Sequence, residues 1–269
     1  MRLSEARVVL TGASGGIGLA IATALCASGA HVLAVARHRE PLMPLLERYP
    51  RSLSWVGADL TVAPDRQNVL VAAEAIGGIN LLINAAGVNQ FAMLEQLDDS
   101  DIHGMLAVNV DAPICLTKLL LPLLKQAESA MVVNVGSTYG SIGYAGYASY
   151  CATKFALRGF SEALRRELAD TRVGVLYVAP RATRTSMNSP AAQALNDALK
   201  ASVDDPQAVA SAVIHAIAGE RRDLYLGWPE RFFVRLNSLL PNLVDRGLRK
   251  QLPLIRRLSQ KPDNENLKP

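Results

Sequence analysis

Short apolar runs alternate with longer helix-like segments along the first 180 residues of the chain. The apolar runs are rich in valine and nearly free of charge, which is typical of strands buried on both faces of a parallel sheet. A last, shorter run follows near residue 225. The predicted strands are "ARVVLTG", "AHVLAVA", "SLSWVGADL", "INLLINAAG", "AMVVNVGS", "RVGVLYVAP" and "DLYLG".

Segments with helix-starting or helix-ending signals connect these runs. The first ends at Gly29, and the last starts with Pro206 in its first turn and ends at Gly219. This alternation predicts an α/β fold, a Rossmann-type doubly wound parallel sheet flanked by helices. The predicted helices cover residues 16–29, 64–76, 112–126, 149–168 and 206–219.

The regular alternation stops near residue 180, and two irregular parts follow. Residues 181–205 predict a loop with a short helix, an insertion of the kind that often covers a site. We expect a single domain over residues 1–227, followed by a basic amphipathic extension over residues 228–269. Pro241 and Pro253 should break this extension into short helices.

Composition and charge narrow the function. With 269 residues and 50% hydrophobic side chains, the chain can bury the core of one large α/β domain. Its net charge of +4 is gathered in the extension, where eight Lys or Arg lie between Glu230 and Lys261 against two carboxylates. The rest of the chain is slightly acidic, so we expect no nucleic-acid partner.

Apolar residues recur at helical spacing in the extension, with arginines between them. The favoured interpretation is an apolar face packed on the domain or on a neighbouring subunit. Contact with an anionic membrane surface or an acidic carrier is a second interpretation, and a lid over a long apolar substrate is a third. The apolar residues are Phe232, Phe233, Leu236, Leu239, Leu240, Leu243 and Val244.

Three cysteines show no CxxC spacing, and the four histidines are scattered singly. This predicts reduced thiols, no metal site and a cytoplasmic protein, which its extension could hold at a membrane surface. No apolar signal segment precedes the first predicted strand. The cysteines are Cys26, Cys115 and Cys151.

Two patterns carry candidate chemistry. The turn "TGASGGIG" separates the first strand from the first helix, and Gly12, Gly16 and Gly18 let its backbone approach a pyrophosphate at a helix N-terminus. Tyr150 and Lys154 stand four apart on a predicted helix and share one face. An ammonium there would lower the pKa of the phenol, which is ordinarily about 10. Taken alone, the pair is more typical of a core tyrosine beside a surface lysine.

The chain contains further motifs, and together with these two patterns they stand in the order and spacing of the short-chain dehydrogenase/reductase family. The chain resembles this family over about residues 5–226. The family's glycine in the last motif is replaced here by Arg181. The matching segments are the glycine turn, "NAAG" at 84–87, Asn109, Ser137, Tyr150 with Lys154, and "PRATRT" at 180–185.

The resemblance implies hydride transfer between a nicotinamide cofactor and a carbonyl carbon. Tyr150 would exchange the proton with the substrate oxygen, and Ser137 would orient that oxygen. Lys154 would hold the ribose and lower the pKa of Tyr150. Asn109 would position a water that relays protons to Lys154, or else would satisfy backbone groups at a helix kink.

The end of the second predicted strand, "LAVARHRE", bears on the choice of cofactor. Ala36 stands where NAD-selective relatives place an acidic residue, and Arg37 follows with a guanidinium suited to a 2′-phosphate. We therefore expect NADP(H), with NAD(H) as the alternative. The implied cofactor-binding residues are Gly12, Ser14, Gly16, Ile17, Gly18, Arg37, Asp59, Leu60, Asn84, Ala85, Gly87, Tyr150, Lys154 and Thr185.

The sequence thus predicts an NADP(H)-dependent oxidoreductase, most simply a reductase of an apolar ketone, aldehyde or 3-oxoacyl substrate. An NAD-linked alcohol dehydrogenase and a non-catalytic cofactor-binding sensor are alternatives. Arg181 and Arg184 could face an acidic substrate group. The resemblance also implies a homodimer or homotetramer. The candidate contact surfaces, which could equally face the sheet, are residues 119–125 and Phe155, Leu157, Phe160 and Leu164.

Overall fold

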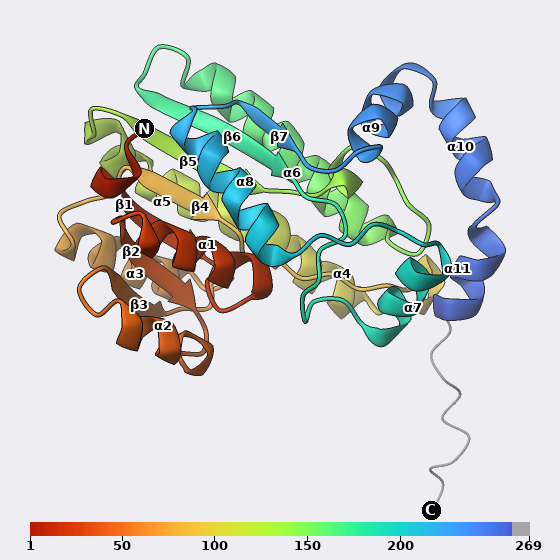
Figure 1. Ribbon diagram of the computed structural model, residues 1–269, viewed down its shortest axis with the longest axis horizontal. Coiled ribbons are helices and arrows are strands. Elements are labelled where there is room, and N and C mark those ends of the chain that lie inside the picture. The colour runs from red at the N-terminus through yellow and green to blue at the C-terminus, as the bar shows by residue number, and fades with distance from the viewer. Residues whose placement is uncertain (260–269) are drawn as a thin grey trace, which may run out of the picture.

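The computed structural model describes residues 1–259, and its seven strands form one sheet in which every neighbouring pair is parallel. The end of the predicted extension, residues 260–269, lies outside the described residues. The strand order is β3-β2-β1-β4-β5-β6-β7, so the direction of winding reverses between β1 and β4 (Figure 1). In such sheets, ligands bind beside this point at the carboxyl ends of the strands. The strands are β1 (Arg7–Thr11), β2 (His31–Ala36), β3 (Leu53–Gly57), β4 (Leu81–Asn84), β5 (Ala130–Val135), β6 (Val173–Ala179) and β7 (Asp223–Tyr225).

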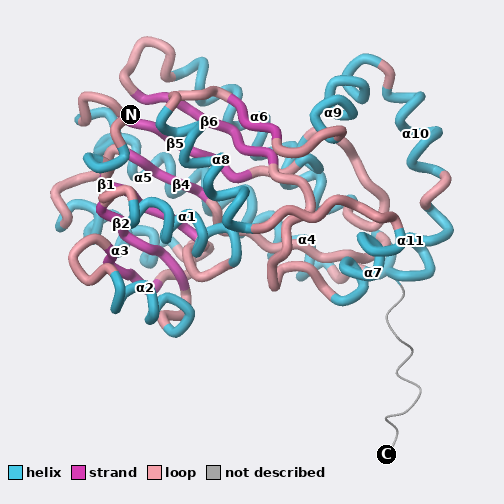
Figure 2. The backbone as a smooth tube through the Cα atoms, in the orientation of Figure 1, coloured by secondary structure: helices cyan, strands magenta, loops and turns pink. Residues whose placement is uncertain are grey.

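Helices cover both faces of the sheet, as expected for strands that are apolar on both sides. One face carries α1, α2 and α8, and the other carries α3, α5 and α6. Figure 2 shows α4, α7 and α11 beyond one end of the strands, together with long loops. The helices are α1 (Gly16–Ala27), α2 (Met43–Arg48), α3 (Ala63–Ala75), α4 (Asp99–Leu106), α5 (Ala112–Gln126), α6 (Ala148–Glu167), α7 (Pro190–Ala198), α8 (Pro206–Ala218), α9 (Glu230–Leu239), α10 (Pro241–Arg249) and α11 (Leu252–Ser259).

The predicted strands and the five predicted helices are all present. The short helix expected within residues 181–205 is α7, and the prolines divide the extension as expected: Pro241 begins α10 and Pro253 lies in the first turn of α11. The sequence pattern does not reveal α2, which has only six residues, or α4, whose first turn is acidic and whose apolar residues are few.

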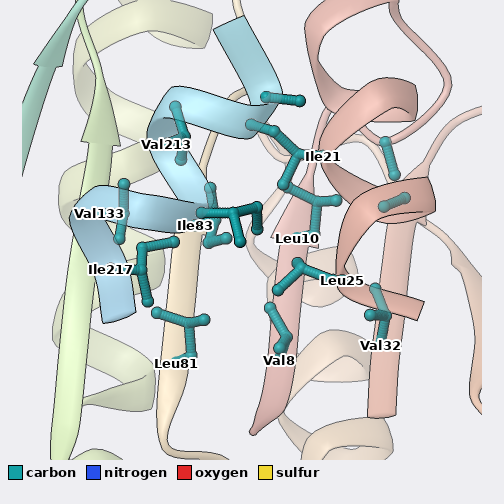
Figure 3. Packing of buried hydrophobic residues seen from close by; sticks show 14 of the residues in the cluster. Val8, Leu10, Ile21, Leu25, Val32, Leu81, Ile83, Val133, Val213 and Ile217 are labelled. Carbon is teal, nitrogen blue, oxygen red and sulfur yellow. The ribbon is translucent and has the colours of Figure 1, made fainter. Parts of the chain in front are cut away.

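Alternate residues of the central strands build the core on the α1 and α8 face (Figure 3). Residues one position on, such as Val9 and Leu82, belong to the core of the opposite face. Both faces are therefore dry, which explains why these strands form uninterrupted apolar runs in the sequence. The residues labelled in Figure 3 are Val8, Leu10, Ile21, Leu25, Val32, Leu81, Ile83, Val133, Val213 and Ile217.

One helical stretch, Asp99–Gln126, is long and apolar enough to cross a membrane by length and composition. In this fold it comprises α4, a π-helical turn at Ala107–Asp111 and α5. Leu116, Leu120 and Leu124 of α5 are fully buried in the core that α3, α5 and α6 form with the sheet. The apolar side chains of α5 therefore pack in the core of the domain.

Two valines on different helices allow a matched test of this core. Val213 of α8 is fully buried, whereas Val71 of α3 is 56% exposed. We expect Val213→Ala to lower the free energy of unfolding by about 2 kcal/mol, because two methyl groups leave a packed site. Val71→Ala should change it by less than about 0.5 kcal/mol. Urea denaturation measures both values, and equal effects would contradict the packing described.

Candidate active site

The four predicted catalytic residues meet at the carboxyl ends of β4 and β5, next to the point between β1 and β4 where the strand order reverses. Ser137 lies two residues after the end of β5. Tyr150 and Lys154 lie near the start of α6, and Lys154 Nζ donates a hydrogen bond to the last backbone carbonyl of β5 at 3.1 Å. Asn109 borders the same place, since a Cβ on Gly87 would lie 3.3 Å from Asn109 Oδ1 and 3.6 Å from Lys154 Nζ.

The glycine turn forms a cradle that side chains would fill. Gly12 has a left-handed backbone (φ 64°), and a Cβ there would lie 2.7 Å from the backbone of Ala86. A Cβ on Gly18 would lie 2.1 Å from the carbonyl oxygen of Gly12. Only glycines fit here, and no side chain in the described range 1–259 caps the first turn of α1, so the cradle fits the predicted dinucleotide. Ser14 and Ile17, also predicted to bind it, are half-buried within this turn.

Two other segments close against this cradle. Thr11 Oγ1, at the end of β1, accepts hydrogen bonds from the N–H groups of Ala85 and Ala86 at 3.0 and 3.1 Å. Thr185 reaches the cradle from the loop after β6, since a Cβ on Gly16 would lie 2.6 Å from its Cγ2. The predicted cofactor residues Gly16, Ala85 and Thr185 are thus gathered at one edge of the sheet.

Ser137 is held with its hydroxyl hydrogen available. Its Oγ accepts a hydrogen bond from the N–H of Tyr139 at 3.1 Å, so its own O–H is left to donate. Tyr177 of β6 fixes the backbone, because its hydroxyl donates to the Ser137 carbonyl oxygen at 3.2 Å. Gly136 and Gly140 make room for this ring: a Cβ on either would lie 2.3 Å from Tyr177.

Burial sets the acidity of Tyr150. The residue is only 9% exposed, and burial raises the pKa of its phenol to about 12, while the nearby Ser137 hydroxyl opposes this shift. The ammonium nitrogen of Lys154 lies over the ring, 5.6 Å from the centroid, and burial outweighs any lowering of the phenol pKa by its charge. The net shift of the Tyr150 pKa is therefore upward, opposite to the predicted direction. A phenol that stays protonated at neutral pH is a proton donor.

Lys154 is a buried ammonium with unused donor capacity. Burial lowers its pKa to about 8. Of its three N–H groups, one has an acceptor among the described residues, the carbonyl at the end of β5. Ribose hydroxyls would supply the acceptors that a buried cation needs, so Lys154 also fits the predicted nicotinamide nucleotide.

Asn109 is occupied by the protein backbone. In the π-helical turn, its Oδ1 accepts from the N–H of Val88 at 2.9 Å and its Nδ2 donates to the Val88 carbonyl at 2.8 Å. Nδ2 also donates to Thr153 at 3.0 Å, and the Thr153 hydroxyl donates to the carbonyl of Tyr150 at 2.7 Å. Of the two roles predicted for Asn109, the structure has the one that satisfies backbone groups at a helix irregularity.

Asn84 belongs to a buried polar chain. Its Nδ2 donates to Asn134 of β5 at 2.8 Å and to Thr117 of α5 at 3.1 Å. Asn134 donates in turn to Ser161 of α6 at 2.9 Å. The amide nitrogen of Asn84 is thus committed to the core, and only its Oδ1, which has no partner within residues 1–259, is left to meet another group.

The expected adenosine end of the site lies where β2 and β3 finish. Asp59 Oδ1 accepts from the N–H and hydroxyl of Thr61 at 2.9 and 2.7 Å, and these bonds lower the Asp59 pKa. Arg37 is exposed beside Asp59 and forms no ion pair with the described residues. Arg39 instead stacks on Trp55, 5.8 Å from the ring centroid. Arg37 is therefore the guanidinium available to a 2′-phosphate. The remaining predicted cofactor residues, both half-buried, are Leu60 and Gly87.

A third apolar cluster surrounds Tyr150 and includes the C-terminal extension. The hydroxyl of Tyr144 donates to Gln251, just before α11, and a Cβ on Gly146 would lie 3.2 Å from Ile255 of α11. Packing on the domain is therefore the correct interpretation for α11. The buried members of the cluster are Phe91, Met105, Tyr147, Tyr150, Cys151, Ala192, Leu195 and Ile255.

Arg181 ties the loop after β6 to the extension. Its guanidinium donates to Asp204 at 2.7 and 3.0 Å and to Glu230, the first residue of α9, at 3.2 Å. Only 18% of its side chain is exposed. The predicted contact between Arg181 and an acidic substrate group is therefore wrong, because two carboxylates of the protein already match its charge. Arg184 is exposed.

Several residues that orient the catalytic groups are not among the predicted site residues. Thr11 begins the glycine turn and Thr153 directly precedes Lys154. A hydroxyl at a position expected to be buried must find a hydrogen-bond partner, and this could have identified both residues. Tyr177 lies in a uniformly apolar run. Only its packing against the glycines on either side of Ser137 reveals its role.

Known proteins resemble this chain along most of its length. The family model described as short chain dehydrogenase matches residues 6–196. An uncharacterized oxidoreductase of Bacillus subtilis is 30% identical over 259 residues, covering 93% of this chain and 73% of the relative. A 3-oxoacyl-[acyl-carrier-protein] reductase of Vibrio cholerae is 30% identical over 223 residues, covering 79% and 90%.

Solved structures share the fold. A short-chain dehydrogenase from Streptomyces avermitilis matches with a TM-score of 0.78 at 30% identity, covering 94% of this chain and 99% of that one. A short-chain dehydrogenase from Burkholderia cenocepacia, solved in complex with NADP, matches with a TM-score of 0.79 at 26% identity, covering 92% and 99%.

The depressed pKa of Lys154 predicts a pH dependence of cofactor binding. Below a pH of about 8 the side chain is charged and donates to ribose hydroxyls, and above it the charge is lost. We expect NADPH affinity, measured by fluorescence titration, to fall as pH rises from 7 to 9 with a midpoint near 8. Lys154→Arg keeps its charge throughout and should flatten the profile. A flat profile for the unmodified protein would contradict the assignment.

Proposed function

The chain belongs to the short-chain dehydrogenase/reductase family of NAD(P)-dependent oxidoreductases, and we propose that it is an NADP(H)-dependent reductase of an apolar carbonyl compound. The substrate class is an apolar ketone, an aldehyde or a 3-oxoacyl group, which becomes the corresponding alcohol. The observation that carries this proposal is the meeting of Ser137, Tyr150 and Lys154 beside the glycine cradle, inside an apolar cluster.

Ser137 and Tyr150 act on the substrate oxygen. The available O–H of Ser137 donates to the carbonyl oxygen and stabilises the negative charge that grows on it. Tyr150 then gives its proton to that oxygen as a general acid. The phenol of Tyr150 holds its proton at neutral pH, as a general acid must.

Lys154 binds and orients the cofactor. When bound, the nicotinamide cofactor supplies the hydride that reduces the carbonyl carbon. Lys154 would donate its two remaining N–H groups to the ribose, while the first turn of α1 would hold the pyrophosphate. Thr153 links the backbone of Tyr150 to Asn109, so the start of α6 keeps its position relative to the segment after β4.

The preference for NADP(H) is supported by the different surroundings of two arginines. Arg39 is committed to the face of Trp55, whereas Arg37 stays exposed at the end of β2 and forms no ion pair in the described part of the chain. Ala36 offers no carboxylate to hold a 2′-hydroxyl. The Burkholderia cenocepacia relatives crystallised with NADP add support from outside the chain.

An apolar substrate is supported by the surroundings of Tyr150. Rings from Phe91 and from the loop that carries Tyr144 and Tyr147 meet the apolar side chains of α7 and α11 here. Such walls favour an alkyl or aromatic group over a charged one.

Removing the acid tests the reaction. We expect Tyr150→Phe to lower kcat by about 10²- to 10⁴-fold while NADPH affinity stays within about twofold, because the lost hydroxyl acts on the substrate oxygen. Tyr147→Phe, a neighbouring ring in the same cluster, serves as the control and should keep most activity. Steady-state NADPH oxidation with a panel of ketones, aldehydes and 3-oxoacyl thioesters measures both. A fully active Tyr150→Phe enzyme would overturn the proposal.

Removing the guanidinium tests the cofactor. We expect Arg37→Ala to weaken NADPH binding by roughly 10- to 100-fold, the value of a charge-assisted hydrogen bond, and to leave NADH binding unchanged. Arg39→Ala is the matched control, because Arg39 stacks on Trp55, and should affect NADPH less. Equal affinities for the two cofactors, unaltered in Arg37→Ala, would favour an NAD-linked enzyme.

A further inference from the structure

The extension turns apolar side chains toward the surface. The rings of Trp228 and Phe232 have centroids 6.2 Å apart, and those of Phe232 and Phe233 are 5.9 Å apart, so the three form one patch. Within α9 and α10 the buried residues are Val234 and Val244. We call the exposed set the apolar ridge; its members, 43% to 79% exposed, are Trp228, Phe232, Phe233, Leu239, Leu240 and Leu243.

The domain holds α9 by the side opposite the ridge. Val234 is buried, and Asn237 donates to the backbone carbonyl of Ser141 at 3.0 Å. At about 3.6 residues per turn, Phe232 and Leu239 lie roughly opposite Val234 and point away from the domain. Figure 1 shows α9 and α10 standing at the edge of the molecule, joined back to it by α11. The predicted packing on the domain is therefore wrong for the exposed members of the stripe, whereas Val244 is buried and Leu236 is half-buried.

Positive charge surrounds the ridge. Seven arginines and lysines of the three extension helices and their connections are exposed, and none forms an ion pair with a residue that the structure describes. Of the two carboxylates in the same stretch, Glu230 is paired with Arg181, which leaves Asp245. We call the seven the basic flank: Arg231, Arg235, Arg246, Arg249, Lys250, Arg256 and Arg257.

This combination selects one kind of partner. A second copy of the chain would cover the ridge, but a symmetric contact would also bring two basic flanks together, and like charges oppose it. An acidic protein would match the flank but would not explain the exposed aromatic and leucine side chains of the ridge. An anionic lipid surface meets both needs, since headgroups attract the cations and the interface takes up the apolar rings.

We propose that α9 and α10 dock the protein on an anionic membrane surface. The apolar ridge enters the headgroup boundary and the basic flank contacts the lipid phosphates and carboxylates. The contact is peripheral, because α9 and α10 span only ten and nine residues and lie along the surface. This docking does not depend on the proposed reaction.

Vesicle sedimentation of the full chain tests the docking. Vesicles of phosphatidylcholine alone and with roughly 30% phosphatidylserine are compared at low and physiological salt, where anionic lipid attracts basic segments most strongly at low salt. We expect retention on the anionic vesicles only, weakened by salt. No retention at low salt, or equal retention on both vesicles, would overturn the proposal.

Two variants with matched controls separate the ridge from the flank. Phe232→Ser with Phe233→Ser should weaken anionic-vesicle binding by about tenfold or more, whereas Phe155→Ser should not, although Phe155 and Phe233 are both 43% exposed. A triple charge variant of the basic flank should weaken anionic-vesicle binding by about a hundredfold, whereas a triple charge variant elsewhere on the surface should not. The flank variant combines Arg246→Gln, Arg249→Gln and Lys250→Gln. The control variant combines Arg166→Gln, Arg172→Gln and Lys125→Gln.

The same variants identify the competing partners. Thermal unfolding and NADPH binding should match the unmodified protein, because every substituted side chain is exposed. If light scattering shows that the double phenylalanine variant loses a dimer while vesicles are not bound, a second copy covers the ridge and the proposal fails. Binding to an acyl carrier protein without binding to vesicles would likewise replace the membrane with an acidic protein.

Discussion

The catalytic groups depend on a buried chain of hydrogen bonds that fastens α6 to the sheet. Asn84 of β4 donates to Asn134 of β5, which donates to Ser161 of α6. A buried amide left unsatisfied costs roughly 1–3 kcal/mol, so these groups hold one another in a single register. Ser161 lies two helical turns after Lys154, and the start of α6 is thereby set above the end of β5.

The same burial acts on the two groups that α6 carries and favours the uncharged form of each. It raises the pKa of Tyr150 to about 12 and lowers that of Lys154 to about 8. The protein itself gives the ammonium one acceptor, so the site is incomplete until a ligand brings hydroxyls to it. The apolar cluster around Tyr150, which α7 and α11 complete, limits the water that could take their place.

Local patterns were enough to predict the strands and most helices, because apolar runs depend on near neighbours in the chain. The motifs named candidate catalytic residues that the fold brings to one place. Interactions between distant segments were out of reach. Arg181 looks like an exposed arginine in the sequence, and its carboxylate partners lie 23 and 49 residues away. Helical periodicity places Phe232 and Leu239 on one face, but it cannot say on which side of α9 the domain lies.

Arg181 limits how this chain could be recombined with its relatives. One guanidinium neutralises Asp204 in the loop after β6 and Glu230 at the start of α9. Consider a chimera that takes residues up to 227 from a relative with glycine in place of Arg181 and the rest from this chain. It would carry Glu230, 28% exposed, without its cation. A chimera joined at residue 180 would keep all three charges together. The loop and the extension therefore form a single exchangeable unit.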